Sequence, residues 1–397
     1  MYIDRDIGKL LKKYATQYPV VTVTGPRQSG KTTLCRHTFP NRKYVSLEDL
    51  DNREYANSDP RGFLLEYSNG VIIDEVQRVP DLLSYIQGIV DEKNIKGEFI
   101  LTGSSQLELT KSVSQSLAGR TILLKLLPFS YTEIYGKTKF MPSSLDEVLY
   151  NGFYPRIYVD KLDATEALSS YISTYIERDV RQFYNIKDLT LFQRFLQLCA
   201  SRVGQLLNFS NIAGDCGVSV PTIQNWISVL EQSFIIYRLP PFFANIKKRL
   251  VKTPKIYFYD TGLCAFLNGV KKVEHIQSLP TRGNLFENFV ISEFIKLDYH
   301  NSFKNNFFFY RDKSGIEVDL IINDGQKNIP IEIKAGQTFA NDFTKNLDYY
   351  KKVTSSIVKG NIIYTGKTQK RTDYNIYNYF DSFKTFNKGE YTKIGHR

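Results

Sequence analysis

One stretch of eight residues constrains the fold of this chain more than any other feature of its sequence. Between Gly25 and Thr32 it reads glycine, four residues of varied type, then glycine, lysine and threonine. Gly25 and Gly30 allow the backbone turns that aim successive amide N–H groups at phosphate oxygens. A β-branched run precedes the stretch and a helix-compatible run follows it, so we predict a strand, a phosphate-binding loop and a helix in that order.

The polar residues of this loop have predicted tasks in binding a nucleotide. We expect Lys31 to place its ammonium group at the β- and γ-phosphates, and Thr32 to place its hydroxyl group on Mg²⁺. The positive end of the following helix would face the same anion. An ordinary glycine-rich turn is the alternative, and the flanking strand and helix argue against it. The predicted nucleotide contacts are Gly25, Pro26, Arg27, Gln28, Ser29, Gly30, Lys31, Thr32 and Thr33.

Length and composition limit the remaining possibilities. The chain has 397 residues, more than one hydrophobic core usually serves, so two or three domains are expected. No apolar run approaches the roughly 18 residues of a membrane span, and the beginning of the chain has no apolar signal core, so we expect a soluble cytoplasmic protein without membrane contact. The cysteines lack paired spacing and are predicted to be reduced packing residues. They are Cys35, Cys199, Cys216 and Cys264.

Residues 1–140 alternate predicted strands with predicted helices. Near-continuous apolar strands of this kind are typical of a parallel sheet covered by helices on both faces. Asp74 and Glu75 end the third strand, at the edge where open α/β sheets bind ligands. We expect Asp74 to hold Mg²⁺ through water, and Glu75 to orient and polarise the water that attacks the γ-phosphate. A simple acidic turn is the alternative.

Two further residues are candidates for contact with the phosphate. Ser104 follows the fourth strand, and its hydroxyl group could reach the γ-phosphate or the attacking water. Arg120 could supply positive charge to the transferring phosphoryl group, either within its own chain or in a neighbouring subunit. A surface position is the alternative for Arg120.

These segments resemble a family of bacterial and archaeal ATPases of the AAA+ class that carry a C-terminal domain of unknown function. The resemblance extends over essentially the whole chain and rests on residues 25–34, 73–77, 101–105 and 117–120. It implies ATP as the ligand, a sheet with the strand order 5-1-4-3-2, Glu75 in the catalytic role and a sensor in the fourth strand. It implies no known substrate beyond the nucleotide.

Residues 141–280 are predicted to form a helical and winged-helix segment. Short helices at 209–219 and 221–230, joined by a glycine-containing turn, are typical of the helix-turn-helix, and strands at 234–239 and 255–259 would form a wing. With a net charge of +11, a basic cluster between these strands could contact the phosphates of double-stranded DNA. A solvated surface or a protein-contact module is the alternative. The cluster is Lys247, Lys248, Arg249, Lys252 and Lys255.

Residues 281–397 are predicted to form an α/β domain with a restriction-endonuclease-like core. An amphipathic helix at 285–295 precedes two strands, and the Asp-Gly pair between the strands is a hairpin signal. Glu332 and Lys334 are two positions apart on the second strand and therefore share one face, with Asp319 able to lie opposite them.

This charged set resembles the metal site of nucleases related to restriction endonucleases. The resemblance implies that Asp319 and Glu332 bind Mg²⁺, that Lys334 positions or activates water, and that Glu287 on the preceding helix completes the site. A plain surface salt bridge is the alternative, and such a fold can persist after its activity is lost.

Three functions remain open from the sequence. The first is an AAA+ ATPase that couples ATP hydrolysis to a rearrangement on a DNA or protein partner, either as a single chain or as a homo-oligomer. The second is a metal-dependent DNA nuclease gated by ATP. The third is a nucleotide-binding scaffold without catalysis, against which the presence of Glu75 argues.

Overall fold

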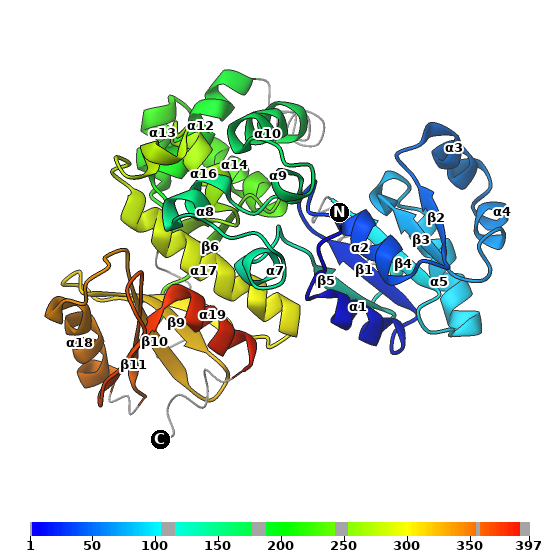
Figure 1. Ribbon diagram of the computed structural model, residues 1–397. Coiled ribbons are helices and arrows are strands. Elements are labelled where there is room, and N and C mark those ends of the chain that lie inside the picture. Colours follow the sequence, from blue (N-terminus) through cyan, green and yellow to red (C-terminus); the bar gives the residue numbers. More distant parts are fainter. Residues whose placement is uncertain (1, 105–115, 177–187, 243–252, 355–357, 390–397) are drawn as a thin grey trace. The chain divides into compact units, whose positions relative to one another are not determined.

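The computed structural model of the chain (Figure 1) describes residues 2–104, 116–176, 188–242, 253–354 and 358–389. The chain divides into two compact units. Unit 1 contains residues 1–129 and 232–234, and unit 2 contains residues 130–231 and 235–397. The division of the chain into three domains stays a prediction, because its second and third parts belong to the same compact unit.

Unit 1 is built around a sheet of five parallel strands in the order β2-β3-β4-β1-β5, which confirms the expected strand order. Every residue of β1, β3 and β4 is buried, because helices cover both faces of the sheet. The strands are β1 (Val20–Thr24), β2 (Lys43–Ser46), β3 (Val71–Asp74), β4 (Phe99–Gly103) and β5 (Thr121–Lys125).

Two apolar clusters show how the helices of unit 1 cover the sheet. Alternate residues of β1 point to opposite faces, so Val21 packs with α1 and α2 while Val20 packs with α3, α4 and α5. A short 3₁₀ turn, η1 (Val76–Arg78), follows β3. The helices are α1 (Gly8–Ala15), α2 (Lys31–Thr38), α3 (Leu50–Ser58), α4 (Pro60–Leu65) and α5 (Leu82–Lys93).

The first part of unit 2 is mainly helical. Its helices are α7 (Tyr131–Tyr135), α8 (Leu145–Asn151), α9 (Pro155–Val159), α10 (Ala164–Tyr171), the π-helical η2 (Ile172–Ile176), α12 (Leu189–Ser201), α13 (Phe209–Cys216), α14 (Val220–Gln232), α16 (Thr261–Leu267) and the 3₁₀ turn η3 (Val273–Ile276). The predicted pair of short helices is present as α13 and α14, and α13 ends at Gly217 in the left-handed conformation, with a φ of 73°. The predicted strands are present as β6 (Ile236–Leu239) and β7 (Lys255–Phe258), which pair in antiparallel fashion.

The second part of unit 2 is a six-stranded mixed sheet in the order β12-β13-β11-β10-β9-β8. The predicted hairpin is confirmed, since β9 and β10 pair in antiparallel fashion around a turn with Gly325 at a φ of 94°. The elements are α17 (Arg282–Asn301), β8 (Asn306–Arg311), β9 (Glu317–Asn323), β10 (Asn328–Lys334), the 3₁₀ turn η4 (Asn341–Thr344), α18 (Lys345–Thr354), β11 (Gly360–Tyr364), β12 (Gln369–Lys370), β13 (Tyr374–Asn378) and α19 (Tyr379–Asn387).

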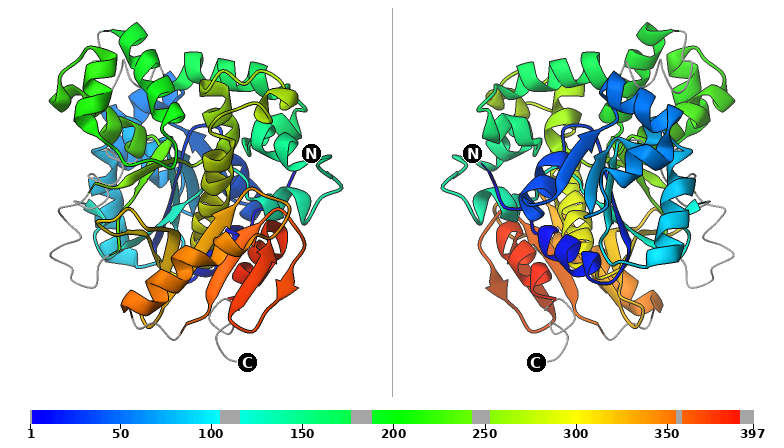
Figure 2. Two further views of the ribbon diagram at one scale, coloured as in Figure 1. Left: turned by 90° about the vertical axis from the view of Figure 1, so that its left-hand side faces the viewer. Right: turned by 90° about the vertical axis from the view of Figure 1, so that its right-hand side faces the viewer.

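Helix α17 lies between the helical part of unit 2 and the mixed sheet (Figures 1 and 2). Every residue from Leu285 to Asp298 is buried, so the expectation of an amphipathic helix is wrong. A helix packed on all sides has no solvent-facing stripe, and its charged residues must find partners inside the protein. Among the described residues, none of the helices is both long and apolar enough to cross a membrane.

Candidate active site

The predicted phosphate-binding loop lies between β1 and α2, at the carboxyl edge of the parallel sheet. A Cβ atom on Gly25 would lie 2.0 Å from the carbonyl oxygen of Leu126, so no larger residue fits directly after β1. Gly30 has a φ of 89° and immediately precedes α2. The two glycines thus allow the chain to turn from the strand into the helix.

Lys31 is buried, and its ammonium group folds back over the loop. It donates hydrogen bonds to the carbonyl oxygens of Gly25 and Pro26, at 3.0 and 2.9 Å. Burial lowers the pKa of Lys31, while the nearby carboxylates of Glu75 and Asp74 act in the opposite direction. The two carbonyl oxygens therefore hold the side-chain nitrogen of Lys31 within the loop itself.

Asp74 ends β3 and accepts three hydrogen bonds from side chains. Its Oδ2 atom accepts from the hydroxyl groups of Thr32 and Tyr44, each at 2.8 Å, and its Oδ1 atom accepts from Thr102. The structure thus brings Thr32 and Asp74 together. Tyr44 carries no signal in the sequence, because its place beside Asp74 follows from the pairing of β2 with β3.

Glu75 follows Asp74 in a left-handed backbone conformation, with a φ of 55°. Its Oε2 atom accepts hydrogen bonds from the Ser104 hydroxyl at 2.9 Å, from the Ser104 amide at 3.4 Å and from the side-chain amide of Gln77. Burial acts to raise the pKa of Glu75, but the charges of Lys31 and Arg27 and the hydrogen bonds outweigh it, so the pKa lies below its usual value. Glu75 is therefore ionised at neutral pH, and Ser104 lies beside it.

The other loop residues occupy the rim of this centre. Arg27 forms an ion pair with Glu48 at 3.5 Å. Gln28 has a φ of 60°, and Thr33 is exposed on the first turn of α2. Thr33 is therefore exposed, whereas the Arg27 side chain is only 11% exposed and its charge acts on Glu75.

A buried arginine supports the loop from behind. The Arg5 guanidinium group donates hydrogen bonds to the carbonyl oxygens of Ser29, at 2.9 Å, and of Leu127, at 2.8 Å. It therefore joins the phosphate-binding loop to the segment that follows β5. The sequence offers no motif that would identify Arg5, since a single arginine near the start of a chain is usually a surface residue.

The structure does not bring Arg120 to this centre. Arg120 precedes β5, and its carbonyl oxygen accepts a hydrogen bond from the amide of Val20, at the start of β1. It lies at the amino edge of the sheet, about 15 Å along the strands from the loop. Its guanidinium group forms an ion pair with Asp91, at 2.5 and 2.8 Å. The expectation that Arg120 acts within its own chain is therefore wrong, and its role in a neighbouring subunit stays a prediction.

In unit 2, the hairpin of β9 and β10 brings three predicted site residues together. The Lys334 ammonium group lies 2.6 Å from Oε1 of Glu332 and 3.8 Å from Oδ2 of Asp319. Asp319 also accepts a hydrogen bond from the backbone amide of Ile333 at 2.8 Å, and Asn346 donates to Glu332 at 3.1 Å. The predicted shared face of Glu332, Lys334 and Asp319 is therefore present.

Glu332 is the most buried member of this set. It is 1% exposed, and its Oε2 atom has no hydrogen-bond partner in the part of the chain that the structure describes. Burial and the charge of Asp319 raise the pKa of Glu332 to about 8, against the opposing charge of Lys334. The hairpin thus holds a carboxyl group that keeps its proton near neutral pH.

Glu287 does not complete this set. Its Oε1 atom accepts hydrogen bonds from the Lys255 ammonium group, at 3.1 Å, and from the Tyr257 hydroxyl group. Within the described ranges, Glu287, Asp319 and Glu332 do not form a group of three ligand atoms within 4.8 Å of one another. Burial raises the pKa of Glu287 to about 7 against the charge of Lys255, and Asp319 adds to the rise. The expectation that Glu287 completes a three-carboxylate site is therefore wrong.

Lys255 requires a second correction. It was expected to belong to the exposed basic cluster, but it is 2% exposed, and its ammonium group contacts the carboxylates of Glu287 and Glu317. The two carboxylates explain the burial, because a buried charge must be paired. The other members of the predicted cluster lie outside the described residues, namely Lys247, Lys248, Arg249 and Lys252.

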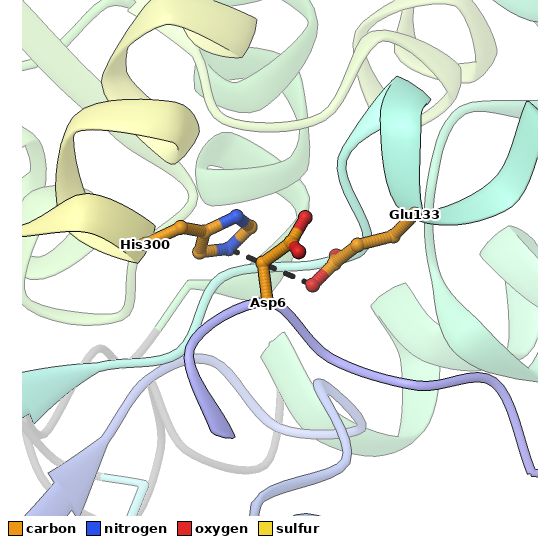
Figure 3. A group of neighbouring side chains, drawn as sticks. All are labelled: Asp6, Glu133 and His300. Atoms are coloured by element: carbon orange, nitrogen blue, oxygen red, sulfur yellow. Dashed lines mark ion pairs between the residues drawn. The ribbon is translucent and has the colours of Figure 1, made fainter. Parts of the chain in front are cut away.

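Further buried charged groups join α7 to α17. His300 points toward the carboxylate of Glu133, with 3.9 Å between Nε2 and Oε1 (Figure 3). Glu293 pairs with Lys296 at 2.8 Å and accepts a hydrogen bond from the amide of Tyr131 at 2.6 Å. These contacts stabilise the packing of a helix that has no exposed face.

All four cysteines are free and buried, as predicted.

The sheet order, the loop and the paired Asp74 and Glu75 define an AAA-like P-loop ATPase domain. A family model described as an AAA domain matches residues 17–135. Two models described as domains of unknown function, DUF8612 and DUF4143, match residues 142–274 and 282–381.

Relatives with similar sequences extend this identification to the whole chain. The uncharacterized protein Rv2008c of Mycobacterium tuberculosis is 30% identical over 339 residues, which cover 84% of this chain and 74% of that protein. The uncharacterized protein MJ1544 of Methanocaldococcus jannaschii is 23% identical over 345 residues, with 78% and 73% covered. The chain belongs to the same family as Rv2008c, a family of AAA-type P-loop ATPases with a C-terminal domain of unknown function.

Solved structures include a similar protein, the Walker-type ATPase paby2304 of Pyrococcus abyssi. It aligns with a TM-score of 0.44 and 14% identity, over 67% of this chain and 96% of that one.

Proposed function

We propose that this protein hydrolyses ATP with the help of Mg²⁺ and couples the reaction to a DNA or protein partner. The observation that carries the proposal is the meeting of Thr32 and Asp74, 2.8 Å apart, directly beside Glu75 and the loop that holds Lys31. These groups follow β1 and β3, the strands on either side of β4, at the carboxyl edge where open α/β sheets bind their ligands. The match to an AAA domain supports the same reaction.

The oxygen atoms at this edge fit a hard cation. The Thr32 hydroxyl and the Asp74 carboxylate are the ligands that Mg²⁺ prefers, and they would hold the ion directly or through water. When bound, the ion would neutralise charge on the phosphate oxygens. Tyr44 and Thr102 orient the carboxylate of Asp74 for this task.

Different residues of the chain would bind the phosphates and activate the attacking water. The loop amides and Lys31 bind the β- and γ-phosphates, and Glu75 polarises a water molecule and receives its proton. The water oxygen forms a new bond to the γ-phosphorus as the bond to the leaving ADP oxygen breaks. Ser104, beside Glu75, is placed to contact the water or the phosphate.

Phosphate release and nucleotide binding, measured together, test this proposal. Lys31→Ala should abolish binding of MgATP, because it removes the side-chain nitrogen held within the loop. Glu75→Gln should bind MgATP but turn it over slowly, because only the group that activates water is lost. Equal hydrolysis by the wild type and by Glu75→Gln would contradict the catalytic role of Glu75. Binding without any hydrolysis by the wild type would instead favour the non-catalytic scaffold.

A second candidate function is a metal-dependent DNA nuclease in the C-terminal part of unit 2. The order of α17, β8, β9, β10, α18 and β11 is compatible with a restriction-endonuclease-like core. The Oε2 atom of Glu332, which has no hydrogen-bond partner among the described residues and lies beside Asp319 and Lys334, is the observation that favours a cation here. Asp319 and Glu332 would be the ligands, and the bound ion would promote formation of hydroxide near a scissile phosphate.

Incubation of the protein with DNA, with Mg²⁺ or Mn²⁺, and with or without ATP, tests the nuclease function. Cleavage that is lost in Asp319→Ala would support it, and an effect of ATP on the rate would support gating. If neither metal produces cleavage under any of these conditions, the domain keeps its fold without this activity.

The partner that we propose is double-stranded DNA, contacted by α13, α14 and the β6–β7 strands as a winged helix. Gln224 and Asn225 are exposed on α14 and available to a groove, while Trp226 is buried beneath them. A protein partner and assembly into a homo-oligomer remain alternatives. Simultaneous replacement of Lys247, Lys248 and Arg249 by alanine should weaken binding to duplex DNA, and unchanged affinity would indicate a protein-contact module.

A further inference from the structure

Gln77 is a buried polar residue in unit 1. It is not among the residues proposed above to bind ATP or to hydrolyse it. It lies in the middle of η1, the 3₁₀ turn that follows Glu75, and it is 7% exposed. The left-handed conformation of Glu75 reverses the chain, so the side chain of residue 77 returns to that of residue 75. Its amide nitrogen donates to Oε2 of Glu75 and lies 3.5 Å from the Ser104 hydroxyl oxygen.

The two carboxylate oxygens of Glu75 have different surroundings. Oε2 accepts three hydrogen bonds, two from Ser104 and one from Gln77. Among the described residues, no donor bonds to Oε1. A carboxylate anchored through one oxygen cannot rotate freely about its last bonds, so the direction of the other oxygen is defined. The unbonded Oε1 is then the atom left to accept a proton from water.

The Gln77 amide has an unused acceptor of its own. Its Oε1 atom is buried and has no hydrogen-bond partner in the described part of the chain. The orientation of the amide follows from its neighbours, because a carboxylate oxygen accepts from the NH₂ group and would repel the carbonyl oxygen. The carbonyl oxygen shares a carbon atom with that NH₂ group, so it lies close to Glu75.

We propose that Gln77 is a positioning residue for ATP hydrolysis, which anchors Oε2 of Glu75 so that Oε1 receives the proton of the attacking water. The inference rests on the proposed hydrolysis of ATP and adds Gln77 as the residue that orients the general base, Glu75.

Steady-state hydrolysis by substituted proteins, with separate measurement of MgATP affinity, tests this role. Gln77→Met keeps the length of the side chain and removes its donor and acceptor, so kcat should fall about tenfold or more while the Kd of MgATP changes less than about twofold. Gln77→Glu places a second carboxylate against Glu75 and should be slower still. Gln77→Asn retains both polar groups and should recover part of the rate lost in Gln77→Met. Gln17→Met, the same change at an exposed position, is the matched control.

The outcomes separate this role from a structural one and from failure of the proposed reaction. A common loss of kcat, MgATP affinity and Tm in Gln77→Met, without recovery in Gln77→Asn, would overturn the positioning role and indicate packing alone. Wild-type rates in Gln77→Met, together with a slow Glu75→Gln, would overturn the role of Gln77 and leave that of Glu75 intact. If the wild type binds MgATP but releases no phosphate, the proposed reaction fails and this inference fails with it.

Discussion

The centre around Glu75 in unit 1 and the centre around Glu332 in unit 2 contain the same kinds of side chain in opposite electrostatic states. Each combines carboxylates with one lysine. In unit 1, Lys31 donates to backbone carbonyl oxygens, and neutral donors hold Glu75, whose pKa lies below its usual value. In unit 2, Lys334 pairs directly with Glu332, and burial raises the pKa of Glu332 to about 8.

This difference shows that the ionisation of a buried carboxyl group depends on all the charges and donors around it. Lys31, Arg27 and hydrogen bonds lower the pKa of Glu75, whereas the charge of Asp319 opposes that of Lys334 at Glu332. Glu75 is buried as well, but the hydrogen bonds and charges that it receives favour its ionised form. Within the residues that the structure describes, one oxygen of Glu332 has no donor, and its ionised form therefore needs a further positive charge. Unit 1 is thus prepared to act as a base at neutral pH, whereas the hairpin of unit 2 is prepared to take up a cation.

The largest expected effect separates the two centres by activity. Glu75→Gln should lower kcat for ATP by about 100-fold or more, because the group that activates water is lost. Glu332→Gln, the same change in the other centre, should leave the rate of phosphate release within about twofold, as expected for independent sites. Phosphate release at saturating MgATP measures both. A comparable loss in the two proteins would show that the centres act together.

The next effect concerns the buried lysine that supports unit 2. Lys255→Met should lower the free energy of unfolding by about 3–5 kcal/mol, because it leaves Glu287 and Glu317 without their shared partner. Chemical denaturation followed by circular dichroism measures the change. The double substitution Lys255→Met with Glu287→Gln should recover part of the loss. A Lys255→Met protein as stable as the wild type would show that the ammonium group is exposed to water in solution.

The pH dependence of stability distinguishes a proton from a cation at Glu332. The folded-state pKa of Glu332 is about 8, above its ordinary value of 4.5, so the folded chain keeps a proton that the unfolded chain releases. The free energy of unfolding contributed by this group is therefore greatest below about pH 4.5 and falls as the pH rises toward about 8. Glu332→Gln should flatten this slope when denaturation is followed in the presence of EDTA.

Added divalent cation should also change the pH dependence of the free energy of unfolding of the wild-type protein. Mg²⁺ or Mn²⁺ should stabilise the wild-type protein more at pH 8 than at pH 6, since the ion replaces the proton on Glu332. An equal response of the wild type and Glu332→Gln to the metal would place the metal elsewhere.

The smallest effect concerns the basic cluster. If the segment contacts DNA phosphates, each lysine that is replaced by alanine should reduce the slope of log K against log salt concentration by about one. Lys247→Ala and Lys248→Ala, measured by fluorescence anisotropy over a range of salt concentrations, provide the values. Lys255 serves as the contrast, because its buried ammonium group should contribute to stability and not to this slope.

The sequence by itself determined the parts whose chemistry depends on neighbours along the chain. The loop from Gly25 to Thr32 requires glycine at fixed positions, and Asp74 with Glu75 must follow a buried strand. The shared face of Glu332 and Lys334 follows from the alternation of side chains along a strand. Such patterns can be read without knowledge of the fold, which is why these elements and the strand order of the resembled family were predicted.

Only the tertiary structure decided which distant residues meet. Arg120 lies at the wrong edge of the sheet to act in its own chain, and Lys255 lies inside the protein, because strand pairing and helix packing set these positions. The partners of Asp74 and the donors to Glu75 likewise come from other strands and turns. Burial and hydrogen bonding then set the charge of each carboxyl group, and neither can be calculated from spacing along the chain.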